Sequence, residues 1–233
     1  MSEQTWGRLH VDPAAVPAWF GPLLESIRWG DSGELARFAR PPGALARESA
    51  VLVLFGHTHL GPDVLLIERS TNLRSHAGQP AFPGGRREAA DRSAVATALR
   101  EANEETRLDP SGVTVVAELP GLWLPPSASV VAPVIGWWHE PSPVSVGDPV
   151  EVAAVHRVPV AHMVEPGNRV QVSHPSGYVG PGFEVGGMLV WGFTAMILDR
   201  LFAMAGWEQS WQEGARVVPF DDGYRVAEGG EAK

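Results

Sequence analysis

One amphipathic helix, preceded by a Pro-Gly-Gly turn, constrains the fold of this chain more than any other feature. The helical pattern begins at about Asp91 and stops near 106–108, ahead of Pro110. Its apolar side chains recur at helical spacing, namely Val95, Ala98, Leu99 and Ala102. A helix with a single apolar face must cover a hydrophobic surface, and β-type runs on both sides of it in the sequence would supply a sheet.

Short runs of apolar and β-branched residues surround this helix and predict that sheet. We expect strands at 49–55, 64–69, 113–119, 130–138 and 150–160, and further helices at 13–29 and 188–205. Turn formers at 56–63 would join the first two strands as a hairpin or meander, whereas 70–90 is predicted to be a long loop. The pattern predicts the α/β class, an α/β sandwich with a mixed sheet.

The length of 233 residues suits one domain with extensions. We expect an N-terminal helix and linker over 1–47, the main domain over 48–205 and a polar C-terminal tail over 206–233. The longest apolar run, Met188–Leu198, is too short to span a bilayer, and no secretory signal is expected at the N-terminus. The chain has no cysteine, which excludes disulfides and thiolate chemistry, and a cytoplasmic location is the default expectation.

The chain is acidic, with 18 Lys+Arg against 27 Asp+Glu and a formal net charge of −9. Binding to nucleic acid requires a basic surface, so neither nucleic acid nor a membrane surface is expected as a partner. A surplus of carboxylates suits a protein that gathers them around divalent metal ions, although it also serves solubility. No Walker-type phosphate-binding motif occurs, which excludes a P-loop ATPase.

Three carboxylates of the predicted helix carry the strongest chemical signal. Glu101, Glu104 and Glu105 stand at i, i+3 and i+4, so they share one helix face. Three like charges at this spacing repel one another, and Mg²⁺ or Mn²⁺, which prefers carboxylate oxygens, would reverse the sign of the interaction. Arg100 can reach Glu104 and hold it, and the glycines of 83–85 would let a carbonyl turn toward the metal. The alternative interpretation is an ordinary solvated acidic helix face.

The segment 82–108 resembles the Nudix box, whose pattern is G-x5-E-x7-R-E-U-x-E-E-x-G-U with U aliphatic. Gly85 matches the first glycine, Asp91 stands at the first acid position, and 100–105 match R-E-U-x-E-E. Eight residues rather than seven separate Asp91 from the box arginine, and Arg107 replaces the late glycine. The resemblance implies a Nudix-type α/β/α sandwich that hydrolyses a pyrophosphate bond with the help of Mg²⁺ or Mn²⁺.

The preceding segment, LLIERSTNLRSHAGQPAFPGG at 65–85, resembles L-L-T-x-R-S-x3-R-x3-G-x3-F-P-G-G, which marks the coenzyme A pyrophosphatase branch of these enzymes. The resemblance implies that coenzyme A, or an acyl or oxidised derivative, is split into 4′-phosphopantetheine and adenosine 3′,5′-bisphosphate. It assigns substrate binding to Arg69, Arg74, Gly78 and Phe82. An arginine suits this task because it can grip a phosphate with two parallel donors.

The same resemblance gives the box residues their roles. Arg100, Glu101, Glu104 and Glu105 would be catalytic, and the three glutamates together with the Gly84 carbonyl would hold the metal ions. Whether Glu101 acts as a general base or as a metal ligand is left open. The roles of Asp91, Arg107 and Glu151 are open too, since Glu151 either adds a carboxylate to the site or simply faces solvent.

Other interpretations are compatible with the sequence. The substrate could be ADP-ribose or a dinucleotide, or the chain could be a Nudix-like module that binds a nucleotide without cutting it. The N-terminal helix and the tail could serve a scaffold role such as homodimer formation, with exposed tryptophans at 207–211. His57 and His59 suggest surface histidines more readily than a metal site, and Ser127 and Ser129 lack a base partner for a serine hydrolase.

Overall fold

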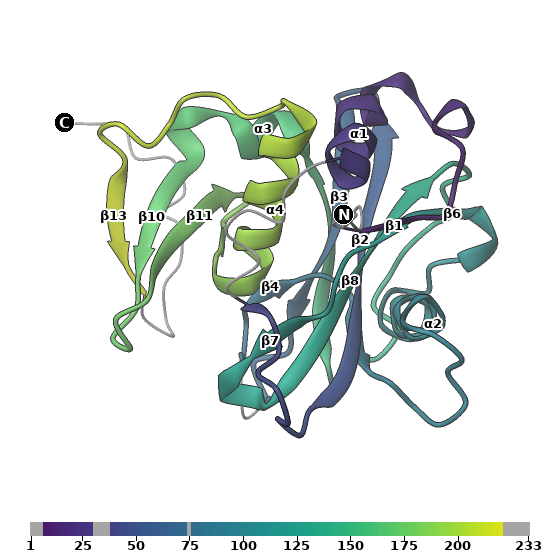
Figure 1. Cartoon of the computed structure of the whole chain (residues 1–233). Helices are drawn as coiled ribbons and strands as arrows, with labels where there is room; N and C mark the ends of the chain where they lie inside the picture. Colours follow the sequence, from purple (N-terminus) through teal and green to yellow (C-terminus); the bar gives the residue numbers. More distant parts are fainter. Residues whose placement is uncertain (1–6, 30–37, 74–75, 221–233) are drawn as a thin grey trace.

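The computed structural model describes residues 7–29, 38–73 and 76–220. Within them, a large sheet has the strand order β1-β6-β8-β2-β3-β4, with β5 paired to β2, β7 to β8 and β9 to β3 (Figure 1). Its strands are β1 (Arg8–Leu9), β2 (Arg47–Thr58), β3 (Gly61–Arg69), β4 (Pro80–Ala81), β5 (Gly84–Arg86), β6 (Val113–Glu118), β7 (Leu122–Leu124), β8 (Ser129–Trp138) and β9 (Val152–Pro159). The long strands β2 and β8 pair in parallel, whereas β2 and β3 form an antiparallel hairpin, so the predicted mixed sheet and hairpin are confirmed.

Helices cover both faces of this sheet. Helix α2 (Ala94–Thr106) lies on one face, and α1 (Gly21–Trp29) and α4 (Gly192–Ala205) lie on the other (Figure 1). Alternate residues of β2 serve the two faces, because successive strand side chains point in opposite directions. Leu52 and Leu54 pack in the cluster that includes α2, and Val53 and Phe55 pack in the cluster that includes α1 and α4. The predicted α/β sandwich is thereby confirmed.

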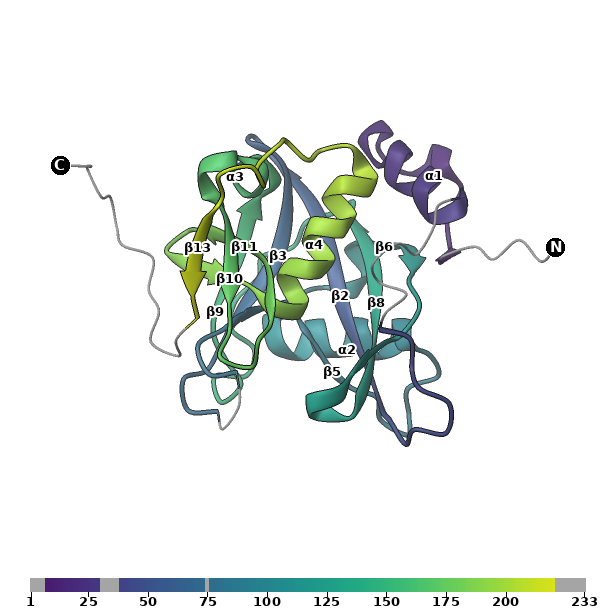
Figure 2. The same ribbon diagram turned by 60° about the vertical axis from the view of Figure 1, so that its left-hand side comes forward.

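A second sheet, not predicted from the sequence, lies beyond α4 (Figure 2). Its order is β12-β11-β10-β13, formed by β10 (Arg169–Ser173), β11 (Val179–Val185), β12 (Met188–Val190) and β13 (Arg216–Pro219). The guanidinium of Arg169 lies 4.4 Å from the ring centroid of Phe183 and 4.1 Å from that of Trp211, and it pairs with Asp199 of α4. Trp211 is only 8% exposed, so the expectation of exposed tryptophans at 207–211 was wrong for this residue.

Three predicted element boundaries were also wrong. The apolar run at 188–190 is strand β12, and α4 begins only at Gly192. The loop predicted at 70–90 contains the short strands β4 and β5. The predicted helix at 13–29 is interrupted, because two 3-10 turns precede α1 and Pro17 separates them. A further short helix, α3 (Val160–Val164), follows β9, and none of the described helices is both long and apolar enough to cross a membrane.

Hydrogen bonds define both ends of α2. At its start, Ser93 Oγ accepts a hydrogen bond of 3.2 Å from the N–H of Ala96. At its end, the N–H of Arg107 donates to the Asn103 carbonyl at 2.8 Å, and Arg107 adopts φ 56°, a left-handed conformation that glycine adopts at lower cost. The glycine of the Nudix pattern is therefore a helix-ending residue, and Arg107 performs that function here with some backbone strain.

Candidate active site

The three glutamates lie on the face of α2 that packs against the glycine turn of β5. They differ in how far they reach into the protein. The side chain of Glu101 is 14% exposed and that of Glu104 is 54% exposed, whereas Glu105 as a whole is 2% exposed. Glu105 is therefore the most buried of the three carboxylates, Glu101 is intermediate and Glu104 is the most exposed.

Only one of the two carboxylate oxygens of Glu105 has a hydrogen-bond partner, and that partner is in the glycine turn. The N–H of Gly84 donates to Glu105 Oε2 at 2.8 Å, while Oε1 is buried and has no hydrogen-bond partner. Burial raises the pKa of Glu105 to about 8, and the charges of Glu101 and Glu151 act in the same direction. A buried acceptor without a donor is costly, so this oxygen favours the uptake of a proton or a cation.

Glycine at both positions of the turn allows this close packing. A Cβ on Gly84 would lie 2.4 Å from the Ala50 carbonyl oxygen and 2.6 Å from Val51 Cα. A Cβ on Gly85 would lie 2.5 Å from the carboxylate carbon of Glu101. The turn is pressed between β2 and the carboxylate face of α2, which brings main-chain groups next to Glu101 and Glu105.

Arg100 joins the carboxylates of this region. Its Nη2 donates to Glu101 Oε1 at 3.0 Å and to Asp91 Oδ2 at 2.9 Å, and its Nη1 donates to Glu104 Oε2 at 2.9 Å. A further bond of 3.0 Å reaches the carbonyl of Arg86 at the end of β5. Burial still raises the pKa of Glu101, although Arg100 acts in the opposite direction. Arg100 therefore offsets part of the mutual repulsion and orients two of the three glutamates.

Asp91 is bonded to Arg100, whose Nε and Nη2 donate to its carboxylate at 3.1 and 2.9 Å. Besides Arg100, its carboxylate accepts hydrogen bonds from the N–H of Glu88 at 2.9 Å and from Thr97 Oγ1 at 3.1 Å. These bonds, with that from Arg100 the largest, hold the pKa of Asp91 well below its usual range. The acid that stands at the first box position thus acts as a positioning residue for Arg100.

Replacing Asp91 by asparagine tests that role. Asp91→Asn keeps the shape but removes the charge facing Arg100, so we expect the free energy of unfolding to fall by about 2 kcal/mol. Turnover should fall about tenfold, because Arg100 no longer holds Glu101 and Glu104 firmly. The Mg²⁺ concentration needed for half-maximal activity should rise only slightly, because Glu101, Glu104 and Glu105 all remain. A large rise in that concentration would instead identify Asp91 as a metal ligand.

The donor chemistry of this face suits a hard divalent cation. Among the described residues, no three carboxylate or imidazole groups already converge as a metal site. The three glutamates point to different partners, because Glu104 is hydrogen-bonded to Arg100 and Glu105 to the N–H of Gly84. The unpartnered Oε1 of Glu105 and the close approach of the glycine backbone to Glu101 nevertheless provide oxygen donors of the kind that Mg²⁺ and Mn²⁺ prefer.

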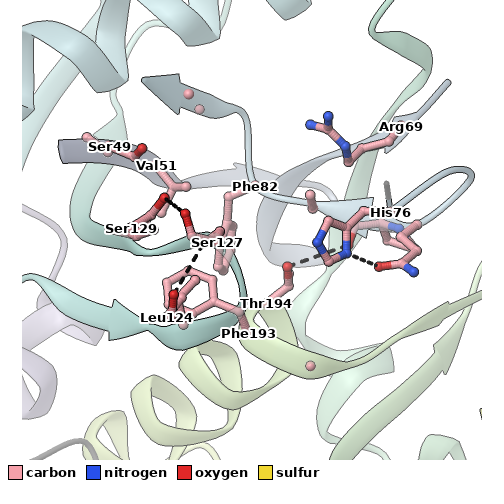
Figure 3. A pocket seen from close by; sticks show the side chains of 18 of the residues that line it. Ser49, Val51, Arg69, His76, Phe82, Leu124, Ser127, Ser129, Phe193 and Thr194 are labelled. Carbon is pink, nitrogen blue, oxygen red and sulfur yellow. Dashed lines mark hydrogen bonds between the residues drawn. The ribbon is translucent and has the colours of Figure 1, made fainter. Parts of the chain in front are cut away.

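A pocket of about 430 Å³ opens beside Gly84 and Gly85. It contains two of the predicted substrate-binding residues, Arg69 and Phe82 (Figure 3). The charge of Arg69 also lowers the pKa of Glu105, so this guanidinium both lines the pocket and lies near the carboxylate face. Gly78, with φ 68°, lies in the turn before β4, where its N–H donates to the Arg69 carbonyl at 3.0 Å. The predicted residue Arg74 lies outside the described residues.

Several residues of the pocket were not predicted to bind substrate. Trp191, Phe193 and Thr194 come from the start of α4, more than eighty residues after the end of α2. The segment 190–198 resembles the coenzyme A branch, but that resemblance did not assign these side chains to a pocket. Ser127 and Ser129 were considered only as nucleophiles, yet they line the same pocket. Glu151, whose role the sequence left open, is close enough for its charge to raise the pKa of both Glu101 and Glu105. His57 and His59 are exposed in the β2–β3 hairpin and do not line the pocket.

Comparison with known proteins identifies the class to which this fold and site belong. Residues 46–175, more than half of the chain, match the family model described as the NUDIX domain. The match includes the glycine turn, α2 and Glu151. The chain therefore belongs to the Nudix family and is a Nudix-domain hydrolase.

Its relatives include Nudix hydrolases called NudL, which are described as uncharacterized. NudL of Escherichia coli strain K12 is 38% identical over 162 residues, which cover 62% of this chain and 76% of the relative. NudL of Salmonella newport is 34% identical over 164 residues, with coverages of 62% and 76%. Among solved structures, a MutT/nudix family protein from Enterococcus faecalis is similar, with a TM-score of 0.47 and 18% identity over 72% of this chain and 65% of that chain.

Proposed function

We propose that this Nudix hydrolase cleaves the pyrophosphate bond of coenzyme A or of an acyl or oxidised derivative. The observation that carries the proposal is the buried, half-satisfied carboxylate of Glu105, which lies beside Glu101 and against the glycine turn. A cluster of this kind has a clear use in a site that binds divalent cations and phosphate groups. Water would add to one phosphorus, the bridging P–O bond would break, and the products would be 4′-phosphopantetheine and adenosine 3′,5′-bisphosphate.

Glu101, Glu104, Glu105 and the carbonyl of Gly84 are the residues that would hold Mg²⁺ or Mn²⁺. When bound, such ions neutralise phosphate oxygens and lower the pKa of a coordinated water. Arg100 keeps Glu101 and Glu104 in place, which limits the reorganisation needed for binding. Glu101 could also accept a proton from water, because burial raises its pKa while its side chain remains 14% exposed.

The position of Arg69 supports a substrate whose phosphate groups lie between the pocket and the carboxylates. Its Nε is buried without a hydrogen-bond partner, and its side chain lines the pocket. A guanidinium in this condition can donate to a phosphate oxygen without first breaking a bond to the protein at that atom. The coenzyme A assignment itself rests on the likeness of 65–85 to the signature of the coenzyme A branch.

A hydrolysis assay with Mg²⁺ or Mn²⁺ tests the proposal, using coenzyme A beside ADP-ribose and NADH and separating the products by chromatography. We expect 4′-phosphopantetheine to form only in the presence of the metal. Glu104→Gln should lower its rate of formation about a hundredfold, because the variant loses one oxygen ligand. Glu25→Gln, a change at an exposed glutamate of α1, is the matched control and should leave the rate unchanged.

The outcomes separate the two parts of the proposal. Cleavage of ADP-ribose or NADH in place of coenzyme A would retain the chemistry and contradict the substrate. Binding of these nucleotides without turnover would instead identify a non-catalytic nucleotide-binding module. In that case Glu104→Gln should leave the binding response intact.

A further inference from the structure

The pocket beside the glycine turn has to receive one of the two groups that flank the reacting pyrophosphate. Gly84 and Gly85 form part of its wall, so the pocket reaches the glycine turn that packs against the carboxylate face of α2. Its volume of about 430 Å³ falls within the range of about 300–1,000 Å³ that is common for small-molecule sites. Coenzyme A offers two candidates, an uncharged pantetheine arm and an adenosine that carries a 3′-phosphate.

The walls of the pocket are apolar and held in place by packing. Phe82, which lies between β4 and β5, and Val131 of β8 are buried, and Phe193 comes from α4. Trp191 completes the wall and is itself fixed by stacking, with ring centroids 3.9 Å from Phe220 and 5.5 Å from His174. A rigid apolar slot of this kind favours a ligand with aliphatic surface, which the gem-dimethyl and methylene groups of pantetheine provide.

The pocket carries hydroxyls at one end, whereas Arg69 and His76 lie at the other, with His76 Nδ1 3.0 Å from Gln79 Oε1. Ser127 and Ser129 lie on one side of Phe82, and Arg69 lies on the other (Figure 3). Ser127 Oγ donates to the Leu124 carbonyl at 3.3 Å and Ser129 Oγ donates to the Ser127 carbonyl at 3.2 Å. Because each hydroxyl has used its proton, its oxygen is left to accept a hydrogen bond from a ligand N–H.

This distribution of charge disfavours a phosphomonoester at the serine end of the pocket. Arg69 is the only arginine or lysine among the described lining residues, and it lies with His76 at the end opposite the two serines. A 3′-phosphate at the serine end would meet apolar walls and two hydroxyls that already donate to carbonyl groups, with neither Arg69 nor His76 beside it. An amide N–H at the same place would meet an acceptor.

We infer that the pocket is the subsite for the pantetheine arm, and that the 3′-phosphoadenosine half of the substrate lies outside it. The inference rests on the proposed function, since it presupposes a coenzyme A-type substrate. It assigns Phe193, Trp191, Ser127 and Ser129 as specificity-determining residues. It also predicts that recognition of the pantetheine arm depends on the start of α4, a part of the chain remote from the catalytic motif.

Calorimetric titration with the two product fragments tests the inference without turnover. The probes are 4′-phosphopantetheine and adenosine 3′,5′-bisphosphate, each in the presence of Mg²⁺. Ser127→Trp would fill the serine end, so we expect the Kd for 4′-phosphopantetheine to rise about tenfold or more, while the Kd for the nucleotide changes less than about twofold. Ser111→Trp, at an exposed serine of another surface turn, is the matched control and should change neither.

A second variant guards against a folding defect in the first. Phe193→Ala removes an apolar wall rather than adding bulk, and it should also weaken 4′-phosphopantetheine selectively. A rise in the nucleotide Kd with an unchanged 4′-phosphopantetheine Kd would overturn the subsite, as would two unchanged values or no binding of 4′-phosphopantetheine to the unmodified protein. If these titrations contradict the subsite but coenzyme A is cleaved in the hydrolysis assay, only the subsite assignment is wrong. If coenzyme A is not cleaved, the proposed function itself is wrong.

Discussion

Glu105→Gln is expected to lower turnover by about a thousandfold, or ~4 kcal/mol of transition-state stabilisation. Glutamine keeps an oxygen that can accept the 2.8 Å bond from the Gly84 N–H, so the local fold should survive. It removes the negative charge from the deepest carboxylate of the α2 face, which is the one with an unpartnered oxygen. Steady-state kinetics at saturating Mg²⁺ would measure the effect.

The same variant should reduce a pH dependence of stability in the metal-free protein. Because the pKa of Glu105 rises from 4.5 to about 8 on folding, the folded protein keeps a proton that the unfolded chain releases within this window. The folded state therefore binds more protons than the unfolded state, and stability falls as the pH rises from about 5 to 8. The slope from one such group is at most about 1.4 kcal/mol per pH unit.

Thermal unfolding at several pH values, with and without Mg²⁺, separates this explanation from a merely structural role. The unmodified protein should lose melting temperature toward pH 8 without metal and regain it when Mg²⁺ is added. Glu105→Gln should reduce both changes. Glu104→Gln is the matched comparison, since Glu104 is 54% exposed at its side chain, and it should leave the metal-free pH profile unchanged. A profile in Glu105→Gln identical to that of the unmodified protein would contradict the assignment.

The parts of the fold that were predicted from the sequence are those with a strong local pattern. The β2–β3 hairpin and the end of α2 were predicted because alternation, helical spacing and the following proline are visible within a few residues. The carboxylate face was predicted for the same reason, as Glu101, Glu104 and Glu105 are neighbours on one helix. The interactions of Arg100 with Glu104 followed from i, i+4 spacing alone.

The rest depends on contacts between distant segments. Strand β12 was predicted as helix because Met188–Val190 is a short apolar run, and such a run does not distinguish the two states. The burial of Trp211 depends on Arg169, which is far away in the sequence and would itself be expected at the surface. The pocket likewise combines β2, β5, β8 and the start of α4, and the place of Asp91 behind Arg100 became visible only in three dimensions.

The two glycines of the turn should respond differently to the same substitution. In Gly84→Ala the new Cβ would meet main-chain atoms of β2, 2.4 Å from the Ala50 oxygen and 2.6 Å from Val51 Cα, which cannot move without disturbing the sheet. Strand β5 must then shift, and the N–H that holds Glu105 shifts with it. We expect unfolding to become easier by about 2–3 kcal/mol and activity to be lost. Chemical denaturation together with steady-state kinetics would measure both effects.

In Gly85→Ala the new Cβ would meet the end of the Glu101 side chain, 2.5 Å from its carboxylate carbon, and a side-chain end can swing away. Stability should therefore change by less than about 1 kcal/mol, while turnover falls about a hundredfold because Glu101 is displaced. Gly21→Ala, a position in α1 with open space around it, should change neither quantity. Full activity in Gly85→Ala would mean that catalysis does not depend on the close approach of Glu101 to the turn. An equal loss of stability in both variants would contradict this distinction. It would mean that the new Cβ at either position displaces the whole turn, and that the Glu101 side chain does not move away by itself.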